Sequence, residues 1–526
     1  MHVPLLLTDF LDRAADLYGD KKAIFDDHRV FTYSEMKKRS NQLSRGLVSL
    51  GVEKGDKVAF LAPNSSEMLE GFYGVFQAGA VMTPLNTRLQ PGDYQFILEH
   101  SESKVLFADY TLFPLIQPTL PNLPSLEHVF VHGGETEGAP SYEAWLSSFS
   151  DAPFENVSLE ESDIASLLYT SGTTGNPKGV LLTHRANYLH AMSAMHHLRV
   201  TDKDTLLHVL PMFHVNGWGS PFYYTANGAS QIMLRRTDPK LILEKIQKYG
   251  VTVLHMAPTV LNMVIEAFEK EKPNIPQDVR VVIAGSAPPP AFVRKVEETL
   301  GWKFVQVYGM TEIAPLITTS ELRSMDLDLS AEERYRLKAK AGYAMIGSKV
   351  KVVDELGDEV PHNGKAIGEI ITRTNNTMEG YYKNEEATSA TLRNGWLYTG
   401  DMAVVDENGN IEIVDRKKDV IISGGENISS IEVEGALYEH PAILEAAVVA
   451  IPDDKWGEVP HAVVVLRDGA ILTDLELMDY CRGKLAHFKA PKSVSFIEEL
   501  PKTASGKIQK VLIRKSYWVD KGRLVN

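Results

Sequence analysis

The sequence is poor in cysteine and in long apolar runs. A single cysteine, Cys481, occurs among 526 residues, which excludes an intramolecular disulfide framework and a cysteine-based zinc site. No apolar run approaches the roughly 20 residues that a membrane-spanning helix needs. The N-terminus lacks a basic start and has only three consecutive leucines, so we expect no signal peptide. We therefore expect a cytoplasmic protein, with peripheral membrane contact left open.

Positive charge is also in short supply. Lysine and arginine number 54 against 69 aspartates and glutamates, a formal net charge of −15. Such a chain is not a general nucleic-acid binder, although a local basic patch can still hold a nucleotide. Apolar residues at 44% and charged residues at 23% are typical of a globular protein. The chain is longer than a domain with one ordinary hydrophobic core, so we expect at least two domains.

Two familiar catalytic signatures, the Walker A loop and Gly-x-Ser-x-Gly, are absent. The chain has instead a loop rich in glycine and hydroxyl groups, Tyr169 to Gly179, between the apolar residues 164–168 and 180–182. This pattern predicts a strand, a loop and a second strand. Backbone N–H groups in a Gly-rich turn form a concavity for anions, and Lys178 adds positive charge. The loop is a candidate polyphosphate site, with an ordinary Ser/Thr/Gly surface loop as the alternative.

The first 165 residues alternate between helical and strand patterns. Ser34 is the expected N-cap of an amphipathic helix that continues to Leu50, and Ser65 to Ala78 is a second helix. Residues 57–61 and 81–85 are expected strands. This alternation predicts a mostly parallel sheet covered by helices.

Between residues 205 and 312, four expected strands each end in a distinctive turn. The turns are Pro211 to Gly219, Ala257-Pro258, Gly285 to Pro290, and Tyr308 to Glu312. Ligands of open α/β sheets collect beyond the carboxyl ends of the strands, so the four turns predict one shared crevice.

From Gly347 to Ile413 the pattern changes to short strands and turns, which indicates a β-rich subdomain. A charged segment at 415–419 then precedes a new α+β pattern. We therefore predict an α/β protein in which helix-covered parallel sheets and a β-rich subdomain of about 343–415 form a large N-terminal domain, 1–415. Residues 416–526 would form a small α+β C-terminal domain.

The Gly-rich loop, Tyr-Thr-Ser-Gly-Thr-Thr-Gly-Asn-Pro-Lys-Gly-Val from Tyr169, closely resembles the signature of the adenylate-forming (ANL) enzymes, which include acyl-CoA synthetases, peptide-synthetase adenylation domains and luciferases. Further motifs follow in the family's order: Tyr308-Gly309-Met310-Thr311-Glu312, Tyr398-Thr399-Gly400-Asp401, the segment from Ser423 to Ile428, and the segment from Pro501 to Lys507. The resemblance covers essentially the whole chain. It implies ATP-dependent activation of a carboxylic acid and a mobile C-terminal domain.

The resemblance also implies a set of residues that contact ATP or AMP. They are Thr170, Ser171, Gly172, Thr173, Thr174, Gly175, Lys178, Gly285, Ser286, Ala287, Gln306, Val307, Tyr308, Gly309, Met310, Thr311, Asp401, Arg416 and Lys507. Tyr308 would flank the adenine and Asp401 would accept the ribose hydroxyls. Thr173 and Glu312 would hold the Mg²⁺ that accompanies ATP, because magnesium prefers oxygen ligands.

Four positions would serve the second half of the reaction. Lys418 matches the hinge of the family, and Gly424, Gly425 and Trp456 are expected to contact coenzyme A. Relatives carry out their two half-reactions with the C-terminal domain in different orientations. The first would bring Lys507, the family's catalytic lysine, into the site, and the second would replace it with the face of Gly424 and Gly425.

The segment from Met212 to Trp218 resembles medium- and long-chain fatty acyl-CoA synthetases, in which a tryptophan gates the acyl tunnel. His214, Trp218 and Gly285 are therefore expected at the acyl site, and His214 joins Lys507, Thr173 and Glu312 as a catalytic candidate. The favoured function is conversion of a fatty acid, ATP and coenzyme A to acyl-CoA, AMP and pyrophosphate. A ligase for aryl or short-chain acids and an acyl-AMP ligase that loads a carrier protein stay open, as does a homodimer.

Overall fold

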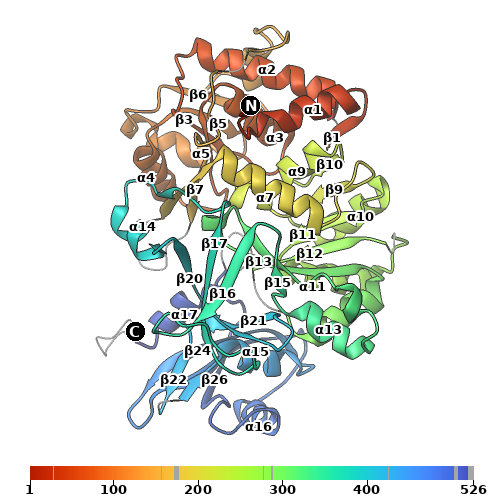
Figure 1. Ribbon diagram of the computed structural model, residues 1–526, viewed down its shortest axis with the longest axis vertical. Helices are drawn as coiled ribbons and strands as arrows, with labels where there is room; N and C mark the ends of the chain where they lie inside the picture. The colour runs from red at the N-terminus through yellow and green to blue at the C-terminus, as the bar shows by residue number, and fades with distance from the viewer. Residues whose placement is uncertain are drawn as a thin grey trace.

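The computed structural model describes residues 1–27, 29–155, 157–170, 177–275, 278–285, 288–424, 426–502 and 508–518. Within these ranges the strands form four sheets. Figure 1 shows the N-terminal helices and sheets in the upper part of the molecule and the C-terminal elements, in blue, below them. No helix in the described ranges is long and apolar enough to cross a bilayer.

The largest sheet has the strand order β15-β14-β13-β12-β11-β9-β10-β1-β2. Its strands are β1 (Lys22–Asp26), β2 (Arg29–Thr32), β9 (Thr205–His208), β10 (Ser230–Met233), β11 (Val253–Met256), β12 (Arg280–Ile283), β13 (Lys303–Gly309), β14 (Leu316–Thr319) and β15 (Tyr343–Ala344). Strands β9, β11, β12 and β13 are adjacent and parallel. Their carboxyl ends therefore lie along one edge, so the four turns predicted from the sequence do follow neighbouring strands.

The second large sheet has the order β18-β8-β7-β4-β3-β5-β6. Its strands are β3 (Lys57–Leu61), β4 (Val81–Pro84), β5 (Ser103–Asp109), β6 (His128–His132), β7 (Ile164–Thr170), β8 (Lys178–Thr183) and β18 (Gly380–Tyr381). Helices α3 (Ser66–Gln77) and α7 (His184–His197) contribute to one hydrophobic cluster with strands of both large sheets. The two helices thus help to join the sheets into one body, as expected for a helix-covered α/β fold.

Helix α2 (Tyr33–Ser49) begins earlier than the sequence suggested. Its N-cap is Thr32, whose hydroxyl accepts a hydrogen bond from the Glu35 backbone, while the Glu35 carboxylate accepts one from the Thr32 backbone at 2.7 Å. The expected cap, Ser34, was wrong. A capping box needs an acid three residues after the cap, and Thr32 has Glu35 there, whereas Ser34 has Lys37.

The third sheet confirms the predicted β-rich subdomain of the fold. Its antiparallel strands are β16 (Ser348–Val353), β17 (Gly368–Thr374), β19 (Leu392–Arg393), β20 (Trp396–Val405) and β21 (Ile411–Arg416). They lie between the large sheets and the C-terminal elements in Figure 1.

The fourth sheet belongs to the C-terminal part of the chain. It contains β22 (Ile421–Ser423), β23 (Glu426–Ile428), β24 (Ile443–Asp453), β25 (Gly457–Leu466) and β26 (Ser493–Phe496), accompanied by α15 (Ser430–Tyr438), α16 (Asp474–Lys484) and α17 (Lys510–Lys515). Cys481 is buried in this core, and burial raises the pKa of its thiol to about 11. Arg467 contacts Glu266 of α11 (Pro258–Glu271) at 2.7 Å and links this part to the body. A domain boundary near residue 416 stays a prediction.

Candidate active site

Three residues predicted from separate motifs meet where β13, β20 and β21 come together. The Tyr308 hydroxyl donates a hydrogen bond of 2.7 Å to Oδ2 of Asp401. Nε of Arg416 lies 2.6 Å from the other carboxylate oxygen, because the two residues are direct partners in the β20–β21 register. The Asp401 carboxylate raises the pKa of Arg416, and burial raises that of Tyr308. The site thus holds a ring, a carboxylate and a fixed cation within one hydrogen-bonded group.

A second group lies around Glu312, which follows β13 in the short 3₁₀ helix Thr311–Ile313. The Tyr381 hydroxyl donates to Oε1 of Glu312 at 2.7 Å. Nζ of Lys178 lies 5.0 Å from the centre of the Tyr381 ring, within the range of a cation–π contact. Burial raises the pKa of Glu312, and the hydrogen bond from Tyr381 opposes that shift. A carboxylate and an ammonium group are thereby held on either side of one tyrosine.

Tyr381 was not predicted from the sequence. It lies on β18, a strand of two residues, and reaches Glu312 because it pairs with Val180 of β8. A two-residue strand gives no periodic signal, and its partner lies about two hundred residues earlier in the chain. The one available signal was a tyrosine directly after Gly380 in a turn, and that pattern is common in loops.

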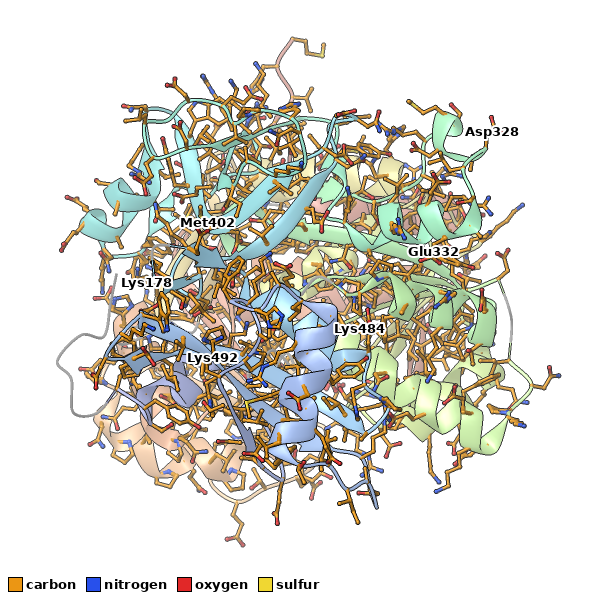
Figure 2. All side chains as sticks on the ribbon, turned by 90° about the horizontal axis from the view of Figure 1, so that it is seen from below. Lys178, Asp328, Glu332, Met402, Lys484 and Lys492 are labelled. Atoms are coloured by element: carbon orange, nitrogen blue, oxygen red, sulfur yellow. The ribbon has the colours of Figure 1, made fainter. Side chains whose placement is uncertain are left out.

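The base of the Gly-rich loop is described and its centre is not. Thr170 and Lys178 are register partners at the ends of β7 and β8, and the Thr170 hydroxyl donates to the Lys178 carbonyl at 3.4 Å. Figure 2 shows the molecule from below, with the C-terminal elements that carry Lys484 and Lys492 facing the viewer and with Lys178 and Met402 labelled beside them. Ser171, Gly172, Thr173, Thr174, Gly175, Ser286, Ala287, Gly425 and Lys507 lie outside the described residues.

The remaining nucleotide candidates follow β12 or lie along and after β13. Gln306 and Val307 are buried, so their side chains point into the body. A Cβ atom on Gly309 would lie 1.7 Å from the carbonyl oxygen of Pro315, so this position requires glycine. Gly285 has a φ of +100°, and a Cβ atom there would meet nothing within 4 Å. Thr311 is buried and Met310 partly buried, directly before Glu312.

The predicted acyl loop follows β9 and has an unusual backbone. Five consecutive residues, from Val215 to Gly219, have positive φ angles of 49°, 49°, 59°, 57° and 73°. Positive φ is costly for a β-branched residue such as valine, so contacts must hold the segment in place. The side-chain amide of Asn216 donates to the Ser166 hydroxyl at 3.1 Å. His214, just before this segment, is partly buried, and its backbone N–H donates to the Pro211 carbonyl at 3.1 Å.

Trp218 turns inward from that loop. Only 6% of the residue is exposed, and its ring is stacked on His255 with centroids 6.0 Å apart. Behind it, the hydroxyls of Tyr223 and Tyr224 lie 3.5 and 3.2 Å from the two ring nitrogens of His255. Burial lowers the pKa of His255 to about 3, so this imidazole is neutral near pH 7. A wall of uncharged rings therefore backs the acyl loop.

The predicted hinge is held by the helix that follows the lysine motif. Arg514 of α17 donates to the Lys418 carbonyl at 2.5 Å and pairs with Asp419 at 2.8 Å. Lys510 pairs with Glu434 at 2.7 Å, and burial lowers the pKa of Lys418. Arg514 and Lys510 were not predicted from the sequence, because basic residues near a chain end are usually solvated.

The two described coenzyme A candidates touch each other. The backbone N–H of Gly424 donates to the Trp456 carbonyl at 2.8 Å. A Cβ atom on Gly424 would lie 2.7 Å from Cε3 of the Trp456 ring. The close approach of the tryptophan therefore depends on glycine at this position.

The described residues offer few ligands for the expected magnesium ion. Among the described residues, no group of three or more His, Cys, Asp or Glu side chains is arranged to hold a metal. Glu312 offers one buried carboxylate. Magnesium in nucleotide sites commonly takes one or two protein carboxylates and completes its shell with phosphates and water. The residues present fit an ion that arrives with ATP.

Comparison with known proteins places this site in a family. Residues 11–382 match the AMP-binding enzyme family, and residues 432–507 match the AMP-binding enzyme C-terminal domain. A peroxisomal trans-cinnamate:CoA ligase from Petunia hybrida is 37% identical over 98% of this chain and 94% of its own. A 2-methylpropanoate–CoA ligase from Humulus lupulus is 40% identical over 97% and 95%.

Solved structures agree with this placement. An anthranilate CoA ligase in complex with anthranoyl-AMP superposes with a TM-score of 0.90 at 28% identity, covering 98% of each chain. ATP-bound MatB from Rhodopseudomonas palustris superposes with a TM-score of 0.85 at 28% identity, covering 98% of this chain and 100% of its own. The chain therefore belongs to the AMP-binding enzyme family of the adenylate-forming superfamily and is an AMP-forming carboxylic acid–CoA ligase.

Proposed function

We propose that the enzyme activates a small carboxylic acid, either a short-chain or an aryl acid, to acyl-AMP and then transfers the acyl group to coenzyme A. This proposal rests mainly on Trp218, whose ring is buried and stacked on His255. Two tyrosines lie behind the histidine. An acyl site backed by these rings would suit a short or flat acyl group better than a long chain. The names of relatives support this choice, since they specify trans-cinnamate, 2-methylpropanoate and butyrate.

A medium- or long-chain fatty acid is the second candidate. The resemblance of the segment from Met212 to Trp218 favours it. Gly285 also supports it, because a Cβ atom there would meet nothing within 4 Å. This alternative requires Trp218 to leave His255, since the ring is almost fully buried where it lies.

In the proposed first half-reaction, Asp401 accepts the ribose hydroxyls and Tyr308 flanks the adenine. An ionised carboxylate has about four lone-pair sites. Asp401 can therefore bind ribose while it keeps Arg416, which lies 2.6 Å away. These contacts would fix the α-phosphate relative to the crevice.

The chemical problem of this half-reaction is repulsion between anions. An oxygen of the substrate carboxylate attacks the α-phosphorus, and the bond from phosphorus to the pyrophosphate oxygen breaks. Magnesium, bound with ATP, supplies positive charge at the phosphates. Glu312 and Thr173 would hold that ion, while Lys178 and Lys507 would stabilise the charge that develops in the transition state. Tyr381 would keep Glu312 ionised and in place.

In the proposed second half-reaction, the thiolate sulfur of coenzyme A attacks the acyl carbon. The bond from that carbon to the AMP phosphate oxygen breaks, so a thioester and AMP result. The C-terminal domain would turn about Lys418 between the two steps and bring Gly424, Gly425 and Trp456 to the coenzyme.

A cytoplasmic location and a homodimer also remain proposals, and two relatives that act on trans-cinnamate and butyrate are named as peroxisomal.

The experiment is a panel of acids in a pyrophosphate-release assay with ATP, magnesium and coenzyme A. Butyrate, 2-methylpropanoate, trans-cinnamate and benzoate are compared with octanoate and palmitate. We expect the best small acid to exceed palmitate in kcat/KM by at least about tenfold, because a pocket that is too short rejects each extra methylene. Trp218→Ala should reduce the ratio of kcat/KM between the best small acid and palmitate. A wild-type preference for octanoate or palmitate would overturn the small-acid proposal.

A further inference from the structure

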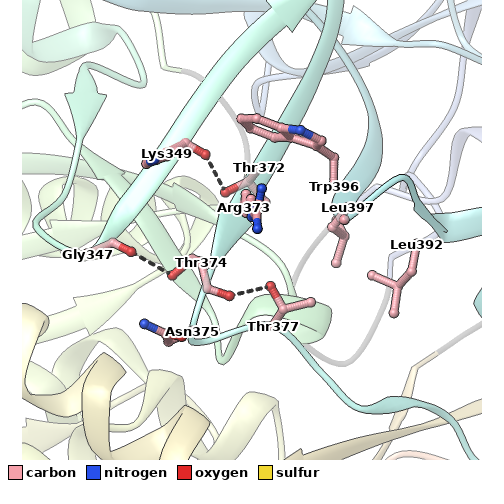
Figure 3. Close-up of a pocket in the computed structure, with 11 residues that line it drawn as sticks. Gly347, Lys349, Thr372, Arg373, Thr374, Asn375, Thr377, Leu392, Trp396 and Leu397 are labelled. Atoms are coloured by element: carbon pink, nitrogen blue, oxygen red, sulfur yellow. Dashed lines mark hydrogen bonds between the residues drawn. The ribbon is translucent and has the colours of Figure 1, made fainter.

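A pocket opens on the β-rich sheet, apart from the residues predicted to bind ATP. Its volume is about 530 Å³, within the range of pockets that hold small ligands. Figure 3 shows Lys349 of β16 and Arg373 of β17 on adjacent strands, with Trp396 and Leu392 across the hollow. Threonine hydroxyls line part of the rim and donate to backbone carbonyls of the same sheet and loop.

The two cations of this pocket stand directly opposite each other. Lys349 and Arg373 are register partners in the antiparallel β16–β17 pair. Like charges in this position destabilise a sheet. Among the described residues, neither side chain makes a hydrogen bond or an ion pair. By contrast Lys351, two residues along the same strand, pairs with Glu359 at 3.1 Å.

This arrangement is notable in an acidic chain. Acids outnumber bases by 69 to 54, and two lysines that flank the β-rich subdomain have acid partners. Lys417 pairs with Glu369 and Lys340 with Asp406. The two opposed cations, which pair with no carboxylate among the described residues, therefore form a positively charged site that favours an anionic ligand. An arginine beside a lysine also suits phosphate, since the guanidinium binds it in a bidentate fashion.

The other side of the pocket is aromatic and apolar. Trp396 is partly buried and lines the pocket together with Leu392 and Leu397, while the ammonium of Lys351 lies 5.8 Å from the centre of the Trp396 ring. Flat aromatic side chains bind nucleobases by stacking. The combination of a ring with two free cations is suited to a ligand that is itself a ring joined to phosphates.

The pocket is separate from the proposed ATP site. Trp396 and Asp401 lie at positions five residues apart on β20, which corresponds to about 16 Å along a strand. Leu397, Thr399 and Asp401 are buried, whereas Trp396 and Tyr398 are more exposed. The strand therefore holds Trp396 of the pocket and the Asp401 carboxylate at different levels along its length.

We propose that this pocket binds a purine nucleotide that carries at least two phosphate charges, with the phosphates at Lys349 and Arg373 and the base against Trp396. Two sources supply that chemistry. One is the 3′-phospho-ADP end of coenzyme A, which rests on the proposed function, and the other is a free nucleotide that acts as an effector.

The test is calorimetric titration of the full chain with adenosine 3′,5′-bisphosphate. A stable acyl-sulfamoyl adenosine is present in excess, so that the adenylate site is filled. We expect one bisphosphate per chain, bound at least tenfold more weakly by Lys349→Glu and by Arg373→Glu. Trp396→Leu should also weaken binding. Each charge reversal creates an opposite pair across the strands, so thermal stability should be maintained and the variants should fold.

The control variant is Lys365→Glu, an exposed lysine of the same subdomain outside the pocket. It makes the same change in net charge and should leave bisphosphate affinity unchanged. Equal affinity in all variants, or no binding to the wild-type chain, would overturn the proposal. Calorimetry needs no turnover, so this failure is distinct from a failure of the proposed ligase substrate.

A second measurement separates the two sources. Acyl transfer from supplied acyl-AMP is followed with coenzyme A and with dephospho-coenzyme A. If the pocket holds the coenzyme, Arg373→Glu raises the KM for coenzyme A about tenfold and leaves that for dephospho-coenzyme A nearly unchanged. If the ligand is a free nucleotide, both KM values stay constant although bisphosphate binding is lost. Either result supports the pocket and identifies its ligand.

Discussion

The hydroxyl of Tyr381 donates a hydrogen bond of 2.7 Å to Glu312, and the face of the same ring lies 5.0 Å from the ammonium nitrogen of Lys178. One buried tyrosine thus connects a carboxylate proposed to hold magnesium with a lysine proposed to contact phosphate. The three residues come from β18, from the segment after β13, and from β8. Their convergence explains how a Gly-rich loop and a distant acid can act on one nucleotide.

We predict that Tyr381→Phe shifts the acid limb of acyl-AMP formation to higher pH. Burial already raises the pKa of Glu312, and the tyrosine hydrogen bond lowers it. Loss of that bond therefore raises the pKa further, so the ionised form is lost at a higher pH. A hydrogen bond to a charged group contributes about 1.5–3 kcal/mol, so the upward shift of the acid limb should be measurable.

The measurement is kcat/KM for pyrophosphate release between pH 5 and 9, with a magnesium titration at each pH. Tyr382→Phe is the matched control, because that neighbouring hydroxyl donates to Glu102 at 3.3 Å, away from Glu312. A Tyr381→Phe profile that coincides with the wild-type profile would refute the assigned role.

Asp401→Asn should weaken ATP binding. The amide keeps the shape of the side chain but removes the charge that faces Arg416 at 2.6 Å, and it accepts fewer hydrogen bonds from ribose. We expect the KM for ATP to rise about tenfold to a hundredfold, with a smaller fall in Tm. If Tm falls and the KM for ATP is unchanged, Asp401 is a structural partner of Tyr308 and Arg416 alone.

Arg514→Ala should impair adenylation more than thioester formation. Arg514 fixes α17 to the Lys418 carbonyl and Asp419, so it anchors the helix that directly follows the lysine motif. We expect acyl-AMP formation to fall about tenfold, the effect of roughly 1.4 kcal/mol, while supplied acyl-AMP still reacts with coenzyme A. Lys515→Ala, on the exposed side of the same helix, should leave both rates unchanged. Equal losses in both half-reactions for Arg514→Ala would contradict the anchoring role.

Much of this arrangement could be predicted from local patterns. The turn at Pro211 follows an apolar strand and the motif from Tyr308 to Glu312 ends another, and parallel neighbours place such strand ends at one edge of a sheet. The motif that ends in Asp401 pointed to the same crevice, and Asp401 does meet Tyr308 there. Signals of this kind work because the residues that carry them lie next to the strand that positions them.

Other features depend on contacts that no local pattern encodes. Tyr381 reaches Glu312 through pairing of β18 with β8, and His255 meets Trp218 and Tyr224 only after three separate segments pack together. The rings behind the predicted acyl loop were therefore not predictable from local patterns, and the medium- or long-chain fatty acid that the sequence favoured stays an alternative. The predicted helix cap was wrong for a more local reason, because the Thr32–Glu35 capping box outweighs an isolated serine two residues later.

We propose that one chain performs two separable half-reactions and that Lys507 serves only the first. The most direct measurement compares Lys507→Ala with the wild type, first in acid-dependent exchange of labelled pyrophosphate into ATP and then in conversion of supplied acyl-AMP with coenzyme A. We predict a loss of exchange of about a hundredfold or more, as for one transition-state donor, with acyl transfer retained. Equal losses in both assays, or wild-type exchange that no acid stimulates, would contradict the account.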